Sequence, residues 1–296
     1  QPHLRPWSSV LRVPASDGLV YCKACMAGLE DETRLTAALA EWRPDLMPEV
    51  LAIDGRRGWM LTQDAGPMLR TITRAEPPNL APWLGILPRY AELQIELAPR
   101  AGELLALGAP DHRPGLLADL LTLMLDDDEA LRIGPPEGLT DDEVEHLRAL
   151  VPGVAALSAE LAGYGIADSL DHGDFHDGNV FIGGGRLTLA DWGDCRVTHP
   201  FFTLGITLRA AAHFAGIADD APPILAMRDA YLEPWQAVAP RADLVRAFAL
   251  AYQLSHISSA RNWHRLIVRL TGEQRAQEAD TVPYKLRQFL LAAGQL

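Results

Sequence analysis

The sequence predicts an α+β fold with two lobes, in which a small antiparallel β-sheet lobe with one main helix precedes a larger, mostly helical lobe. Two observations predict it. Short β-prone runs separated by turn residues fill the first 66 residues, and long segments with helical periodicity fill most of the rest. The chain has 296 residues, which is enough for two such lobes. We therefore divide it into lobes at residues 1–66 and 67–296.

The first lobe is expected to hold two hairpins that flank a helix. Residues 8–25 (SSVLRVPASDGLVYCKAC) contain two β-prone runs around the turn sequence PASDG. Residues 30–42 (EDETRLTAALAEW) place apolar side chains at helical spacing behind an acidic first turn. Residues 48–66 predict a second hairpin around GRRG, and a Gly-Pro break closes the lobe.

The second lobe is expected to be helical, with one interruption. Helical periodicity covers about residues 80–107, 115–131 and 140–164, and returns in several segments from about 202 onward. Between residues 171 and 198 the pattern stops, and NVFI, GGG and RLTLADW predict a short hairpin inside the helical lobe.

Composition narrows the possible functions. The hydrophobic fraction of 48% and the charged fraction of 22% are typical of a globular protein, and no apolar run is long enough to span a membrane. Three cysteines favour a reducing compartment, so we expect a cytoplasmic protein. The net charge of −13 disfavours nucleic acid and anionic membranes. It either attracts cationic small molecules or serves solubility alone. The first residue is Gln rather than Met, which leaves open whether residues precede it.

The stretch DHGDFHDGNV, residues 171–180, has too many polar residues for a core segment. If GGG and the following Arg form the hairpin turn, facing residues have numbers that sum to 369, so Asn179 faces Ala190, beside Asp191. An amide oxygen and a carboxylate at one end of a hairpin suit Mg²⁺. Asp174 lies on the loop that leads into this site, where a carboxylate could accept a proton from an attacking hydroxyl.

Other interpretations are weaker. A zinc site could use His172 and His176, but they lie on an expected loop and no Glu separates them as in zinc proteases. The stretch could also be a plain polar turn. The C-x-x-C pair at Cys22 and Cys25 would point to opposite faces of a strand, so we interpret it as chance. A hydrolase would need a G-x-S-x-G elbow or a nucleophilic Cys, and neither is evident.

The sequence HGDFHDGN followed by DWGD resembles the paired signature of the aminoglycoside phosphotransferase and choline kinase superfamily, a branch of the protein-kinase-like fold. The 17 residues from Asp174 to Asp191, with a hairpin between them, fit the same signature. The resemblance extends from the first hairpin to the last helices. It implies a bilobal protein-kinase-like fold and a Mg²⁺-dependent phosphotransferase that moves the γ-phosphate of ATP or GTP to a substrate hydroxyl.

The resemblance also implies residue roles in the second lobe. Asp174 would be the catalytic base or hydroxyl-orienting group, and Asn179 and Asp191 would bind Mg²⁺ on the nucleotide phosphates. Three further residues would support the loop without taking part in the chemistry: His172, His176 and Asp194.

In the first lobe, the resemblance predicts a Lys on the third strand that contacts the nucleotide phosphates. Lys23 fits, in a chain whose only other Lys is Lys285. A helix Glu should pair with it. We prefer Glu32, because it shares the apolar helix face, and Glu30 is the second choice.

Purine binding is expected from backbone groups around Leu61 to Gln63, in the segment MLTQDAG. The chain departs from protein kinases in one respect. The place of their Gly-rich phosphate loop, residues 5–9 (RPWSS), contains no Gly. Ser8 and Ser9 would then contact phosphate through their hydroxyls and backbone N–H groups.

The acceptor is left open. The acidic balance favours a cationic acceptor such as an aminoglycoside or an amino alcohol, whereas relatives with the same signatures phosphorylate choline, homoserine, sugars or macrolides. Resistance and metabolic roles are both compatible with the sequence. A nucleotide-binding pseudokinase with a regulatory role is the alternative from another class. It is disfavoured because Lys23, Asp174, Asn179 and Asp191 are all present. We expect a monomer or a homodimer.

Overall fold

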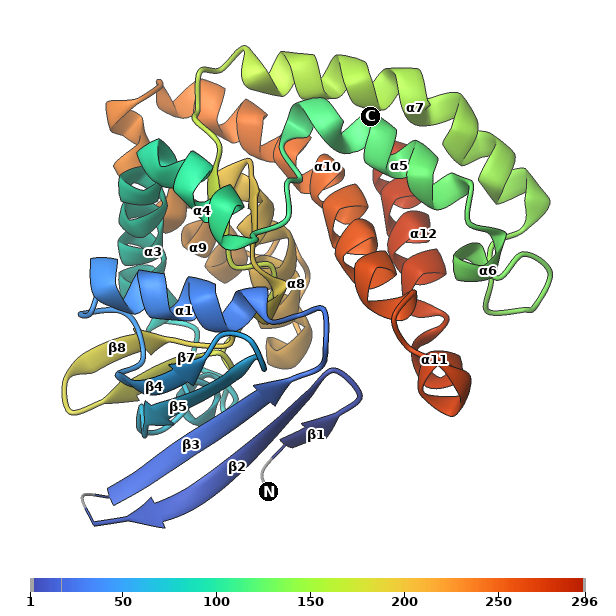
Figure 1. Cartoon of the computed structure of the whole chain (residues 1–296). Coiled ribbons are helices and arrows are strands. Elements are labelled where there is room, and N and C mark those ends of the chain that lie inside the picture. Colours follow the sequence, from blue (N-terminus) through green and yellow to red (C-terminus); the bar gives the residue numbers. More distant parts are fainter. Residues whose placement is uncertain (1–2, 17, 295–296) are drawn as a thin grey trace. The chain divides into compact units, whose positions relative to one another are not determined.

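The computed structural model describes residues 3–16 and 18–294 (Figure 1). Tertiary contacts divide the chain into two compact units. The first comprises residues 1–110, 169–197 and 206–234, and the second comprises 111–168, 198–205 and 235–296. The lobe boundary after residue 66 stays a prediction.

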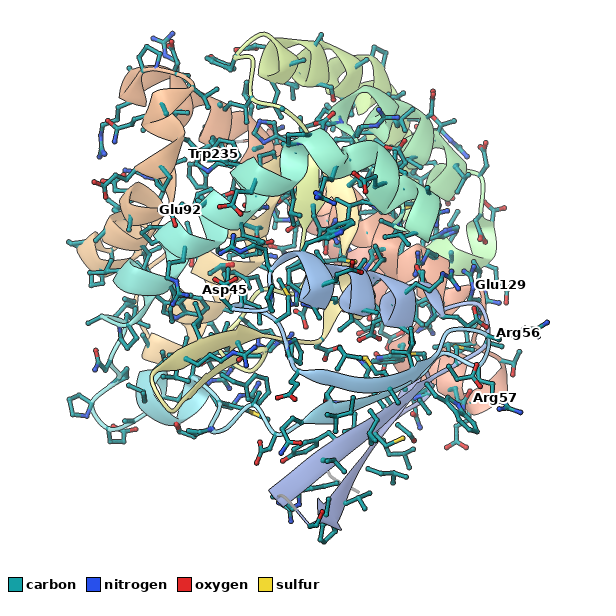
Figure 2. All side chains as sticks on the ribbon, turned by 60° about the vertical axis from the view of Figure 1, so that its left-hand side comes forward. Asp45, Arg56, Arg57, Glu92, Glu129 and Trp235 are labelled. Carbon is teal, nitrogen blue, oxygen red and sulfur yellow. The ribbon has the colours of Figure 1, made fainter. Side chains whose placement is uncertain are left out.

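The first unit begins with a five-stranded antiparallel sheet. Its strands are β1 (His3–Arg5), β2 (Ser8–Ala15), β3 (Gly18–Cys25), β4 (Val50–Asp54) and β5 (Trp59–Gln63), in the order β1-β2-β3-β5-β4. The two predicted hairpins are confirmed. Strand β1 was not predicted, because its three residues are too short to show a periodic pattern. Arg56 and Arg57, in the turn between β4 and β5, project outward (Figure 2).

Helix α1 (Asp31–Trp42) lies across one face of this sheet (Figure 1). Its apolar side chains Leu35 and Leu39 are fully buried, as their helical spacing predicts. Glu32, one turn before Leu35, is buried too. The first turn of α1 therefore brings an acidic side chain to the face of the sheet that the helix covers.

The rest of the first unit contains helices and two further sheets of two strands each. Its elements are α2 (Arg70–Thr73), α3 (Trp83–Leu97), η1 (Ala98–Arg100), α4 (Ala101–Leu107), β6 (Ser169–Asp171), β7 (Val180–Gly183), β8 (Arg186–Leu189), η3 (Trp192–Asp194), most of β9 (Arg196–Thr198), most of α8 (Thr203–Ala215) and α9 (Pro222–Leu232). In one sheet β6 pairs with β9, and in the other β7 pairs with β8. Strands β7 and β8 pair in the predicted register, with Val180 opposite Leu189. The turn is the two residues Gly184 and Gly185, both at positive φ as a tight hairpin turn requires.

The second unit is helical among the residues described. It contains η2 (Pro114–Leu116), α5 (Leu117–Leu125), α6 (Asp128–Leu131), α7 (Asp141–Ala162), η4 (Pro200–Phe202), η5 (Pro234–Ala237, its first residue in the first unit), α10 (Arg241–Ile267), α11 (Gly272–Glu278) and α12 (Thr281–Ala293). A capping box between Thr140 and Glu143 begins α7. Across the described ranges, we find no helix with both the length and the apolar character that crossing a bilayer requires.

Candidate active site

The polar stretch forms a loop between β6 and β7, and its backbone geometry requires Gly173. This residue has φ +80°, and a Cβ built on it would lie 2.1 Å from the backbone oxygen of Asp194. The loop therefore packs directly against the DWGD turn. The two motifs meet through main-chain contact as well as through side chains.

His172 is a structural element of this loop. Its ring is fully buried, its Nε2 lies 3.0 Å from the carbonyl oxygen of Ala190, and its backbone N–H donates to the Tyr90 hydroxyl. Because a carbonyl oxygen can only accept, Nε2 carries the proton. Burial lowers the pKa of His172, so the ring stays neutral. It also packs against the ring of Trp192, with 4.6 Å between ring centroids.

Asp174 presents one carboxylate oxygen to the protein and one away from it. Oδ2 accepts from His176 Nε2 at 3.2 Å and from Asn179 Nδ2 at 3.2 Å. No described residue makes a hydrogen bond to Oδ1. Burial would raise the pKa of Asp174, but the hydrogen bond and charge of His176 hold it below its ordinary value. The group is therefore an ionised carboxylate with a fixed orientation.

His176 donates this hydrogen bond from a defined tautomer. Its Nδ1 accepts from the Gly178 backbone N–H at 2.9 Å, which leaves the proton on Nε2, facing Asp174. Burial alone would lower the pKa of His176, whereas Asp174 raises it above its ordinary value. Protonation of Nδ1 would break the contact with Gly178, and this opposes the rise. His172 and His176 thus have separate protein partners and do not converge on a common point.

Asp177 anchors the loop, and the sequence did not single it out. Its buried carboxylate accepts from Arg74 Nε at 2.8 Å, from the second Arg74 nitrogen at 2.5 Å, and from Thr73 Oγ1 at 2.6 Å. The Arg74 guanidinium in turn lies 3.2 Å from the ring centroid of Phe214 on α8. The loop is therefore tied to α2 and α8 by one carboxylate.

Asn179 and Asp191 meet at the open end of the hairpin. The Ala190 N–H donates to the Asn179 carbonyl at 3.0 Å, which continues the ladder by one step. The Asn179 Nδ2 donates to Asp174, so the amide oxygen Oδ1 points away from Asp174. No described residue donates a hydrogen bond to this oxygen. Asp191 adopts φ +68°, a conformation that costs a non-glycine residue about 1 kcal/mol or more. Such strain is common at functional sites.

Lys23 links the sheet to this hairpin. Its Nζ lies 2.6 Å from Glu32 Oε1 and 2.5 Å from Asp191 Oδ1, and 13% of its side chain is exposed. Burial would lower the pKa of Lys23, but the charges of Asp191 and then Glu32 raise it, so the ammonium persists. Glu30 does not share this ion pair. Its Oε1 accepts instead from the Gly28 backbone N–H.

Asp194 adds a third carboxylate near Asp174 and Asp191. Solvent reaches its side chain, yet the surrounding protein and then the charges of Asp174 and Asp191 raise its pKa to about 7. Arg196 does not cancel this cluster, because it lies 2.8 Å from the buried carboxylate of Asp171. Across the described ranges, no group of three or more His, Cys, Asp and Glu side chains has metal-site geometry.

Four other predicted residues lie on strands β2 and β5 of the sheet. Leu61 pairs with Cys22 on one side and with Ala52 on the other, and the Gln63 N–H donates to Glu49 at 2.9 Å. β5 is therefore an interior strand of the sheet. The purine contact around Leu61 to Gln63 stays a prediction.

Ser8 and Ser9 do not act together. Ser8 faces Cys25 across the ladder and Ser9 faces Ala24, so their side chains point to opposite sides of the sheet. Only Ser8 shares the face of Lys23, and it is buried. The phosphate contact by Ser8 and Ser9 stays a prediction, in which only the Ser8 hydroxyl would approach from the face of Lys23. Tyr21, two residues before Lys23, lies on that same face, and strand alternation could have identified it.

A model of the phosphotransferase enzyme family matches residues 10–241, which include Lys23, Glu32 and the segment from HGDFHDGN to DWGD. The chain belongs to this family. The search of curated proteins gave no match for the sequence. The matched segment contains Lys23, Asp174, Asn179 and Asp191.

Solved structures of phosphotransferases share the fold. An ethanolamine kinase from Plasmodium vivax has 11% identity and a TM-score of 0.63, covering 99% of this chain and 81% of its own. A choline kinase from Streptococcus pneumoniae has 12% identity and a TM-score of 0.58, covering 94% and 89%. An aminoglycoside phosphotransferase from Streptomyces rimosus, in complex with ADP and streptomycin, has 16% identity and a TM-score of 0.51, covering 83% and 92%. The predicted protein-kinase-like fold is confirmed.

Proposed function

We propose that this phosphotransferase moves the γ-phosphate of ATP or GTP to a hydroxyl group of a small molecule. The observation that supports it most is a single constellation of side chains. Lys23 contacts both Glu32 and Asp191, and Asp191 lies beside Asn179, which hydrogen-bonds Asp174. A cation for phosphates, oxygen ligands for a metal and an oriented carboxylate are the parts that phosphoryl transfer requires.

Lys23 would hold the nucleotide phosphates. Its ammonium is compact and, between two carboxylates, permanently charged. Tyr21 on the same face of β3 offers an aromatic surface for a purine, and Ser8 on β2 offers a hydroxyl. Backbone contacts to the purine would come from the segment MLTQDAG, residues 60–66, around Leu61 to Gln63. ATP and GTP are both left as co-substrates.

Asn179 and Asp191 would bind Mg²⁺, and their chemistry fits this ion. Both present oxygen, one from a neutral amide and one from a carboxylate, and the Asn179 oxygen has no donor among the described residues. Bound there, Mg²⁺ would neutralise charge on the phosphates of the nucleotide. In the structure, Lys23 supplies a positive charge to Asp191 at 2.5 Å.

Asp174 would orient and deprotonate the acceptor hydroxyl. His176 and Asn179 both donate to Oδ2, which fixes the plane of the carboxylate and leaves Oδ1 to accept from a hydroxyl. The lowered pKa keeps this group ionised at neutral pH. The reaction would then proceed by positioning and charge stabilisation, with Glu32 and Lys23 setting the electrostatics on the nucleotide side.

A cationic acceptor is favoured, because carboxylates gather where the acceptor would lie. Asp174, Asp191 and Asp194 are close enough to one another to raise the pKa of Asp194. An aminoglycoside or an amino alcohol would meet these charges favourably. Choline, homoserine, sugars and macrolides remain alternative acceptors, and a regulatory pseudokinase is the alternative without turnover. The cytoplasmic location and the choice between monomer and homodimer stay predictions.

Nucleoside diphosphate release tests the proposal. The wild type is assayed with ATP or GTP, with and without Mg²⁺, over a panel of aminoglycosides, amino alcohols, homoserine, sugars and macrolides. We expect Mg²⁺-dependent release with at least one hydroxyl acceptor, and none from D174A, which should still bind nucleotide in a thermal-shift assay. Binding without turnover on any acceptor would favour the pseudokinase. Turnover with neutral acceptors alone would contradict the cationic assignment.

A further inference from the structure

Cys25 lies two residues after Lys23 on β3, and both side chains face helix α1. The Lys23 Nζ contacts Glu32 Oε1 at 2.6 Å, while the Cys25 Sγ lies 3.2 Å from Glu32 Oε2. One strand therefore engages both oxygens of the same carboxylate. Cys25 is buried, and Glu32 is 4% exposed, so water does not easily replace either contact.

The Cys25 thiol is a hydrogen-bond donor here. Burial, and then the charge of Glu32, raise the pKa of this thiol, which keeps the proton on sulfur. A thiol donates weakly, but the acceptor is a carboxylate in a buried position, where hydrogen bonds to charged groups count most. Without this donor, Glu32 Oε2 would lose a partner in a place where an unsatisfied oxygen is costly.

The other side of the Glu32 carboxylate is closed by a glycine. A Cβ built on Gly193, in the DWGD turn, would lie 2.9 Å from Glu32 Oε2. The carboxylate therefore fits against the turn that carries Asp191 only because residue 193 has no side chain. Cys25, Lys23 and Gly193 together define one position for the Glu32 side chain.

We propose that Cys25 is a positioning residue: its thiol holds Glu32 in the orientation that pairs with Lys23, and so prepares Lys23 for the nucleotide phosphates. This inference rests on the proposed function. If the thiol is removed, Glu32 is free to turn from Lys23, and Lys23 then pairs with Asp191 alone. Nucleotide binding should weaken, while acceptor binding should not.

The test is a double-mutant cycle between Cys25 and Glu32. C25V removes the donor at similar size, C25S keeps a donor, and C22V is the matched control, because Cys22 lies on the opposite face of the same strand. We expect C25V to raise the nucleotide KM and Kd about fivefold, which corresponds to about 1 kcal/mol, with the acceptor KM unchanged. C25S should restore most of the affinity, and C22V should match the wild type.

In the E32Q background, C25V should have no further effect on nucleotide affinity, because Cys25 acts through Glu32. If C25V lowers nucleotide affinity by the same factor in the wild-type and E32Q backgrounds, the proposal is overturned. It is also overturned if C25S binds nucleotide as weakly as C25V. The unfolding free energies of the wild type, C25V, E32Q and C25V/E32Q, measured without nucleotide, distinguish failure of this proposal from failure of the proposed function. If the wild type binds no nucleotide, the proposed function fails, and the role of Cys25 in nucleotide binding fails with it. Coupling between residues 25 and 32 in unfolding would then show that the contact exists and is structural only.

Discussion

Replacing Asp177 with Asn should mainly lower the stability of the protein, because Asp177 anchors the loop that carries Asp174. The Asp177 side chain is 7% exposed and accepts three hydrogen bonds, two from Arg74 and one from Thr73. An Asn side chain keeps one oxygen acceptor, but it loses the charge and presents an NH₂ group to a guanidinium. D177N therefore breaks an ion pair and leaves at least one donor without its partner.

The size of the loss follows from these contacts. Hydrogen bonds to charged groups contribute about 1.5–3 kcal/mol, and breaking a fully buried ion pair costs about 3–5 kcal/mol. The Arg74 side chain is 27% exposed, which places this pair below the buried limit. We expect D177N to lower the free energy of unfolding by about 2–3 kcal/mol at neutral pH. The turnover number should also fall, because Asp174 lies on the same loop.

D174N is the matched comparison three residues earlier. Its side chain is 37% exposed, so the unfolding free energy should change by less than about 1 kcal/mol. Turnover should fall by about 10²- to 10⁴-fold, the usual contribution of a general base. Urea denaturation and steady-state kinetics on both variants give the two quantities. The two substitutions should thus show opposite patterns, one mainly in stability and one mainly in rate.

The pH dependence supplies a further check on Asp177. Arg74 and Thr73 outweigh the effect of burial and lower the pKa of this carboxyl below its ordinary value. Its stabilising effect is therefore complete above the unfolded pKa of about 3.9 and is lost as pH falls through the lower folded value. The difference between wild type and D177N should narrow below about pH 4. A D177N protein as stable as the wild type at pH 7, or a gap that widens in acid, would refute the reasoning.

Three other substitutions test separate features. G173A should lower the free energy of unfolding in urea by more than about 2 kcal/mol and should abolish turnover. The reason is that residue 173 has φ +80° and a Cβ there would lie 2.1 Å from the Asp194 backbone oxygen. A stable, active G173A would contradict this packing. G153A, in an exposed helical position where an added Cβ would have no neighbour within 4 Å beyond the adjacent residues and the backbone of its own helix, should raise the unfolding free energy in urea denaturation by about 0.5–1 kcal/mol. Burial lowers the pKa of His199 to about 3, so the unfolded chain takes up a proton first as pH falls below about 6.5, and stability declines by about 1.4 kcal/mol per pH unit from this group. H199N, which keeps an acceptor for the Phe201 N–H, should remove that slope in denaturation curves between pH 6.5 and 5, and an unchanged slope would count against it.

The sequence was most informative where a period or a pairing rule applies. Period-two alternation and the hairpin register placed Asn179 beside Asp191, and both hold in the structure. The acidic first turn of the helix offered two Glu side chains, and the continuation of the apolar face selected Glu32. These inferences need only neighbours in sequence or across one hairpin.

What the sequence could not supply are contacts between distant segments. The partners of Asp177 are Thr73 and Arg74, more than 100 residues earlier, on a helix of only four residues that has no periodic signal. The position of β5 between β3 and β4 could not be predicted either, because strand order is a tertiary property. Strand alternation separates Cys25 from Cys22, but the contact of Cys25 with Glu32 on α1 depends on tertiary packing.

The charges of the site explain why a divalent cation belongs in the proposal. Lys23 contacts two carboxylates, Glu32 and Asp191, and the surrounding protein and the charges of Asp174 and Asp191 raise the pKa of a further carboxyl, Asp194, to about 7. A nucleotide triphosphate brings several more negative charges, so the protein by itself would repel it. Under the proposed function, Mg²⁺ bound at Asn179 and Asp191 would offset this repulsion. In thermal-shift experiments, nucleotide should therefore raise the Tm only when Mg²⁺ is present. Mg²⁺ alone should also raise the Tm, because it would reduce the repulsion among these carboxylates.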